Sequence, residues 1–172
     1  DGGTTIQLAN NAVDGGAGFW QNGLVNWTNV GGDTESAWVN GSGNDAVFSG
    51  TAARVALNSA ITVGNINFAT PGYTIDLSRD LNANSAGKPV FNLTASSLSG
   101  SSGTIQASST WNAGTFTLDT PVSTTSTWSG TIGNIDTRMG FTKQGAGTCE
   151  YAGTRRQFGK LIGGYQIVHV EG

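Results

Sequence analysis

Short runs of alternating apolar and polar residues recur along this chain. The most regular stretch is 51–77, where apolar side chains alternate around Val55, Ile61, Ile66 and Ile75. Nothing in this stretch has the 3.6-residue spacing of a helix. Because side chains on a strand alternate between two faces, the pattern predicts a series of short strands that are buried on one side.

The clearest unit of this pattern lies near the C-terminus. Two β-runs, Phe141–Lys143 and Thr148–Tyr151, flank a Gly-Ala-Gly sequence. They are too short for a stable hairpin, and Gly145 and Gly147 allow a corner with positive φ. We therefore expect a strand, a sharp bend and another strand, with each strand pairing to the coil before it and the coil after it.

A second repeat suggests the size of one coil. Gly103-Thr104-Ile105-Gln106-Ala107 and Gly114-Thr115-Phe116-Thr117-Leu118 lie 11 residues apart. This spacing is about half of a coil of roughly 20–25 residues, at the low end of known solenoid periods. The sequence thus predicts an all-β fold, a parallel β-helix (β-solenoid) of short strands, as a single domain over 1–172.

The stretch Gly140–Gly153, Gly-Phe-Thr-Lys-Gln-Gly-Ala-Gly-Thr-Cys-Glu-Tyr-Ala-Gly, resembles the autotransporter-associated β-strand repeat of secreted and surface β-helical passenger proteins. The region Trp20–Leu77 resembles the front end of such passengers. In that family a leucine usually stands at the position of Cys149, pointing into the coil. The chain departs from the family pattern after Gly153, with Thr-Arg-Arg-Gln-Phe-Gly. The resemblance implies a β-helix and a secreted, extracellular or cell-surface location, with 140–170 forming the signature coil and terminal strand.

Residues 20–50 are rich in aromatic side chains. Trp20, Trp27, Trp38 and Phe48 fall within this stretch. An exposed row of rings would make a platform for stacking on carbohydrate. Large aromatic side chains also bury much area apiece, so they suit an N-terminal cap within 1–50 that closes the end of the core. We favour the cap. Two carboxylates in the same region, Asp33 and Glu35, are expected to be solvated rather than paired.

Charge and length narrow the classes of partner. Charged residues make up 11% of the 172 residues, and the net charge is -3. Nucleic-acid binding calls for clustered Lys and Arg, and the small group at Arg155, Arg156 and Lys160 does not supply it. No apolar run reaches the roughly 20 residues of a membrane span. The chain begins at Asp1 without Met, which suggests a processed or trimmed product.

Few side chains are candidates for chemistry. The single cysteine, Cys149, rules out an internal disulfide and is expected to behave as a small buried hydrophobe. Asp76 and Asp80 could contribute to a calcium site, but the Gly-Gly-x-Gly-x-Asp repeat of secreted β-rolls is absent. The only histidine, His169, has no recognisable nucleophile or carboxylate partner. No catalytic, cofactor-binding or metal-binding residue is assigned, and no cofactor is expected.

Three functions fit these observations. The first is an extracellular structural subunit, not an enzyme, that assembles head to tail through its end strands Thr4–Leu8 and Tyr165–Val170. Strand addition at an uncapped end would propagate into a filament or surface layer. The second is an adhesin-type module that binds surface glycans through aromatic side chains or Asn and Thr ladders. The third, a polysaccharide-active β-helix enzyme, ranks last because the few charges are scattered.

Overall fold

The computed structural model describes residues 10–79, 89–108, 114–133, 139–152, 154–155 and 167–169. Every regular element in these residues is a strand. The strands are β1 (Gly18–Trp20), β2 (Val25–Thr28), β3 (Glu35–Ala37), β4 (Ala46–Phe48), β5 (Arg54–Leu57), β6 (Ile61–Phe68), β7 (Thr74–Asp76), β8 (Leu93–Gly100), β9 (Thr104–Gln106), β10 (Thr115–Asp119), β11 (Thr125–Trp128), β12 (Thr131–Ile132), β13 (Gly140–Gln144), β14 (Thr148–Tyr151), β15 (Thr154–Arg155) and β16 (Ile167–His169).

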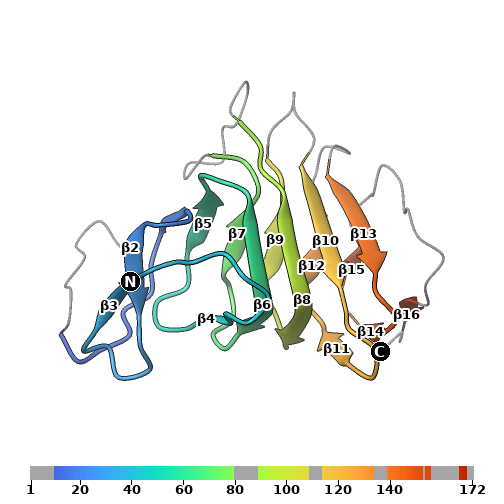
Figure 1. Ribbon diagram of the computed structural model, residues 1–172, viewed down its shortest axis with the longest axis horizontal. Coiled ribbons are helices and arrows are strands. Elements are labelled where there is room, and N and C mark those ends of the chain that lie inside the picture. The colour runs from blue at the N-terminus through green and yellow to red at the C-terminus, as the bar shows by residue number, and fades with distance from the viewer. Residues whose placement is uncertain are drawn as a thin grey trace.

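Most of these strands form two parallel sheets. The first sheet has the order β1-β5-β7-β9-β12-β15, and its strands therefore follow one another in chain order. The second sheet begins with β4, continues through β6 and β8, and divides into β10 and β13 on one path and β11, β14 and β16 on the other. Figure 1 shows the strands succeeding one another along the long axis, from blue at the N-terminal end to orange at the C-terminal end.

The chain visits the two sheets in alternation. From β4 to β9, successive strands belong to the second sheet, then the first, and so on. Ala46 lies opposite Ile66, 20 residues later, and Thr115 lies opposite Gly140, 25 residues later. These steps agree with the expected coil length. The step from Ile61 to its partner Leu93 is longer, 32 residues, because more residues separate β7 from β8 in this pass.

The core consists of side chains stacked from one strand to the next. One column in the second sheet contains four fully or almost fully buried side chains: Ile61, Leu93, Phe116 and Phe141. Threonines occupy the position after each of them and form a column on the outer face: Thr62, Thr94, Thr117 and Thr142. The alternation seen in the sequence therefore places apolar side chains inside and hydroxyls outside.

The corner predicted near the C-terminus is confirmed, with one difference. β13 pairs with β10 and β14 pairs with β11, both in parallel, so the two runs do not form a hairpin. Gly145 has a φ of 73°, whereas Gly147 has no positive φ. Gly147 is needed for space instead, since a Cβ there would lie 2.1 Å from the carbonyl oxygen of Pro121.

The all-β prediction is confirmed for the described residues, and the sheets are parallel as expected. β2 and β3 are the exception, since they pair with each other in antiparallel fashion. Thr4–Leu8 lies outside the described residues, and of Tyr165–Val170 only Ile167–His169 is described. In the described part of the chain, no helix is long and apolar enough to cross a membrane.

Candidate functional site

The tryptophans of the N-terminal region form one packed cluster. The ring of Trp20 lies 5.2 Å from that of Trp27 and 5.0 Å from that of Trp38. Phe48 completes the cluster, with its ring 5.5 Å from Trp20. Trp20 and Trp38 are buried. These rings pack against the first strands of the core and do not form an exposed row for stacking on carbohydrate.

A cleft of about 310 Å³ lies beside this cluster. Its walls come from the segment around β1, from β2 and the residues after it, and from the edge of β4. The lining residues are Val13, Gly15, Gly16, Gly18, Phe19, Asn26, Trp27, Thr28, Asn29, Val30, Asp45, Val47, Phe48, Ser49, Val55 and Tyr73. The volume is at the lower end of the range of about 300–1,000 Å³ found for ligand pockets. We take this β4 cleft as the candidate functional site.

Tyr73 lines the β4 cleft and is held in place by the backbone. Its hydroxyl donates a hydrogen bond of 2.6 Å to the carbonyl of Ser49. Burial raises the pKa of this hydroxyl, while a hydrogen bond with the backbone of Gly16 acts in the opposite direction. Gly15 packs so closely that a Cβ would lie 2.2 Å from the Tyr73 oxygen, and its φ is 70°. The wall is therefore built from close backbone contacts that only glycine permits at this position.

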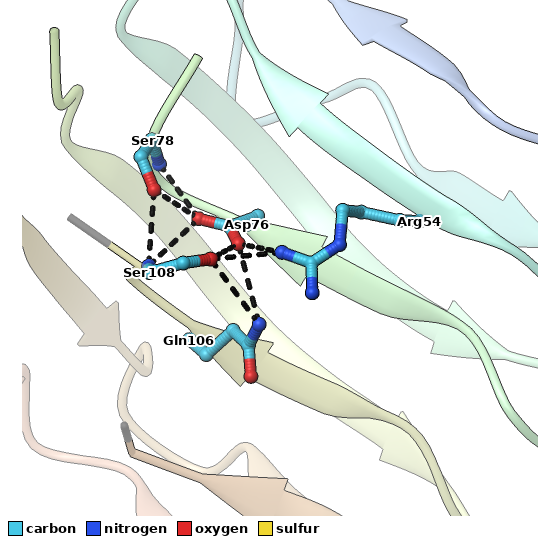
Figure 2. A network of polar contacts seen from close by, with 5 residues as sticks. All are labelled: Arg54, Asp76, Ser78, Gln106 and Ser108. Carbon is cyan, nitrogen blue, oxygen red and sulfur yellow. Dashed lines mark hydrogen bonds and ion pairs between the residues drawn. The ribbon is translucent and has the colours of Figure 1, made fainter. Parts of the chain in front are cut away.

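A second candidate is a polar network on the first sheet, shown in Figure 2. Asp76 on β7 is fully buried and forms an ion pair with Arg54 on β5. Gln106 on β9 donates a hydrogen bond of 3.2 Å to the same carboxylate. The backbone N–H groups of Ser78 and Ser108 donate at 2.9 and 3.1 Å, and both serine hydroxyls also bond to Asp76.

Both carboxylate oxygens of Asp76 are thus fully engaged by donors from three neighbouring passes. A carboxylate satisfied in this way has no lone pair left for a metal or a substrate, so we interpret the network as structural. Asp80, the other residue considered for calcium, lies outside the described residues. Within the described ranges, no group of three or more His, Cys, Asp or Glu side chains is placed to hold a metal.

The two carboxylates near the tryptophans have different environments. Asp33 is exposed and accepts a hydrogen bond of 2.6 Å from the amide of Asn29. Both carboxylate oxygens of Glu35, on β3, are buried and have no hydrogen-bond partner. The prediction that both side chains are solvated is wrong for Glu35. β3 pairs with β2, and the carboxylate oxygens of Glu35 are buried there.

Cys149 behaves as the sequence predicted. It is a free, buried thiol at an inward position of β14. Burial raises the pKa of the thiol, with Lys143 opposing the shift and Glu150 adding to it. A protonated, buried thiol is a poor nucleophile. His169 lies on β16, opposite Tyr151, and only its backbone is described.

Lys143 is a buried lysine that was not among the predicted core residues. Lys143 is 2% exposed and occupies the inward position that Leu118 holds on the neighbouring strand. Its ammonium donates hydrogen bonds to the carbonyls of Gln144 (2.6 Å) and Gly145 (3.1 Å). Burial lowers the pKa of Lys143, and electrostatic interactions with Cys149 and Asp119 act in the opposite direction. The strict alternation of β13 did place this side chain on the inner face, which was the available signal.

Comparison with known proteins supports a relation to autotransporters. Over 64 residues, 36% of its length, the chain is 41% identical to the adhesin BmaC autotransporter of Brucella suis biovar 1 (strain 1330). The chain spans only 2% of the length of that protein. No family model matches the chain. No solved structure matches it either.

Proposed function

We propose that this chain is a β-solenoid module of a surface-exposed, adhesin-like protein of the autotransporter type, and that it acts by binding rather than by catalysis. The observation that carries the proposal is the similarity, 41% over 64 residues, to part of an autotransporter adhesin. The sequence resemblance at Gly140–Gly153 points to the same class of secreted or cell-surface passenger proteins.

The arrangement of the strands supports the solenoid. The first sheet runs in chain order, the second does so along each of its two branches from β8, and the chain alternates between the sheets from β4 to β9. Each return to the second sheet places a strand beside the strand of the previous pass, in parallel. A chain that winds in this way buries a continuous core, with each repeat contacting only its neighbours.

Adhesion is tested with the purified chain on fluorescent beads. Beads coated with the chain and beads coated with serum albumin are counted on monolayers of cultured epithelial cells. We expect several-fold more chain-coated beads to remain after washing, and excess soluble chain to compete them off. Equal numbers of the two kinds of bead on the cells would contradict an adhesin-like role.

Head-to-tail assembly is a second proposal, and it rests on the C-terminal strand. β16 pairs with β14 on one edge and is the last strand of the second sheet in the described part of the chain. Its outer edge could take a strand from another subunit. Negative-stain electron microscopy over a concentration series tests this. Uniform filaments would support assembly, and dispersed particles at every concentration would contradict it.

The glycan alternative loses one of its supports. Trp20 and Trp38 are buried in the N-terminal cluster and cannot stack on a sugar from solution. The other feature that suggested glycan binding, a ladder of polar side chains, is present as the outer threonine column that begins at Thr62. We do not propose a catalytic role, since the sequence motivates none.

A further inference from the structure

β4 is a strand with one free edge. It pairs with β6 and begins the second sheet, and among the described residues no strand pairs with its other edge. The free edge of a parallel sheet presents backbone N–H and C=O groups without partners. Such an edge is the usual template for the addition of a further strand.

The hydrogen bonds of β4 show which groups face the free edge. The carbonyl of Asn44 accepts from Gly64 N at 2.7 Å, and the carbonyl of Phe48 accepts from Ala69 N at 3.0 Å. Even-numbered residues of this strand therefore point toward β6. Because backbone groups alternate in direction along a strand, the N–H and C=O of Val47 point the other way. The side chain of Val47 is 50% exposed.

The neighbouring edge, on β1, is protected in a way that β4 is not. The carbonyl of Trp20 accepts from Asn58 N, on the β5 side, so the backbone groups of Phe19 point away from β5. The amide of Asn26 donates a hydrogen bond of 2.9 Å to the carbonyl of Phe19. A side chain thus occupies this edge. Within the described ranges, no side chain forms a hydrogen bond with the backbone of Val47.

The free edge of β4 forms one wall of the β4 cleft. Val47 lines it together with the two residues that flank β4, Asp45 and Ser49, and the carbonyl of Ser49 is already bonded to the hydroxyl of Tyr73. Residues 26–30, which include Trp27, also line it, together with the aromatic rings of Phe19, Phe48 and Tyr73. Asp45 is the single charged residue in the lining. The cleft therefore combines backbone hydrogen-bonding groups, apolar surface and one negative charge.

We propose that the β4 cleft binds an extended, uncharged or basic peptide segment of a partner protein by strand addition to β4. The main chain of the segment pairs with the N–H and C=O of Val47, and its alternate side chains enter the apolar part of the cleft. This inference rests on the proposed adhesin-like function, for which it names the class of partner. A free backbone edge favours a peptide over a sugar, because a sugar has no strand geometry to match it.

Val47→Pro is the variant that isolates this edge. Proline removes the N–H and blocks the approach of another strand, and it is tolerated on edge strands because no ladder bond to the neighbour is lost. Val122→Pro is the matched control. Val122 is 73% exposed and follows Pro121 in a turn in which Thr124 N bonds to Pro121 O and Ser123 has a φ of 63°. The second position of such a turn favours proline.

A second variant tests the charge of the cleft and keeps its structure. Asp45 accepts a hydrogen bond of 2.7 Å from Asn65 N through its Oδ1 atom. Asp45→Asn retains that acceptor and removes the negative charge. We expect it to weaken the binding of basic peptides several-fold and to leave the binding of uncharged peptides unchanged.

The probe is a phage-displayed library of random ten-residue peptides, selected on the wild-type chain, with the recovered peptides then synthesised. We expect micromolar binding to the wild type and to Val122→Pro, and at least tenfold weaker binding to Val47→Pro. Deuterium exchange over 44–49 should slow when a peptide binds the wild type, because the N–H of Val47 becomes bonded. This second readout does not depend on how any variant folds.

Three results would overturn the inference. They are the recovery of no peptide above uncoated wells, equal binding to Val47→Pro, and unchanged exchange over 44–49 in the bound wild type. Saturation-transfer NMR with methyl α-D-mannopyranoside and methyl β-D-galactopyranoside tests whether the cleft binds a sugar instead of a peptide. Sugar binding that is lost in Val47→Pro, without peptide binding, would make the cleft a glycan site and overturn strand addition.

The bead assay separates this inference from the adhesin-like function on which it rests. Adhering beads together with an absence of peptide binding would leave the adhesin-like role in place and remove the strand-addition site. Peptide binding by a chain whose beads do not adhere would keep the site and remove the role on cell surfaces.

Discussion

Removing the carboxylate of Asp76 should destabilise the fold more than any surface substitution. Asp76 is fully buried and accepts hydrogen bonds from Ser78, Gln106 and Ser108 as well as the ion pair from Arg54. Its partners belong to three consecutive passes of the first sheet, on or just after β5, β7 and β9. In Asp76→Ala, all of these donors lose the carboxylate at once, and Arg54 and Gln106 keep only the hydroxyl of Ser108 as an acceptor, at 2.8 and 3.4 Å.

The magnitude follows from the burial of the two charges. Removing one partner of a buried ion pair typically costs about 3–5 kcal/mol, because the other charge is left uncompensated. The side chain of Arg54 is 21% exposed, so water can solvate part of its guanidinium. We therefore expect the lower end, about 3 kcal/mol. With a urea m-value of about 2–3 kcal/mol/M, the unfolding midpoint should fall by about 1–1.5 M.

The assay is urea unfolding followed by tryptophan fluorescence, and the control is Glu150→Ala. Glu150 is an exposed carboxylate on β14 that accepts one hydrogen bond of 3.3 Å from Thr127. Its removal should change the free energy of unfolding by about 0.5 kcal/mol or less. A loss below about 1 kcal/mol in Asp76→Ala, or an equal loss in Glu150→Ala, would refute the view that the network joins the three passes.

Three further predictions test the strand register, the buried lysine and the tryptophan cluster. Thr94 and Thr117 lie opposite each other on neighbouring strands about 4.8 Å apart, so cysteines at these two positions should form a disulfide. Cysteines at Thr94 and Thr142, which are two strands apart, should not. Mass spectrometry after mild oxidation distinguishes the two results. Lys143→Met should stabilise the chain by about 1 kcal/mol at pH 7, since burial of the charge is then avoided. Burial lowers the pKa of Lys143 in the folded chain, so the unfolded chain keeps its proton to higher pH. The free energy of unfolding of the wild type should therefore rise relative to that of Lys143→Met as the pH approaches 10.5. A difference between the two proteins that stays the same at every pH would contradict this. Trp20→Ala should cost about 3–5 kcal/mol by calorimetry, and a loss under about 1 kcal/mol would mean that the cluster does not close the core.

The inner and outer faces of many strands could be predicted from the order of residues along the chain. Alternation has a period of two and is set by local backbone geometry, so Phe141, Cys149 and Tyr151 could be placed inside without knowing their neighbours. The corner at Gly145 was equally visible, because a positive φ is a local requirement that glycine meets. The all-β class followed from the same local rules.

The pairing of the strands could be read only from the folded chain. Partners are separated by 20 residues at Ala46 and by 32 at Ile61, and loops of variable length between the passes hide this register from the sequence. Register in turn brings Arg54 to Asp76, and in the described part of the chain it leaves the outer edge of β4 without a strand. Alternation is local and can be read from neighbouring residues, whereas pairing depends on how the intervening loops bring distant strands together.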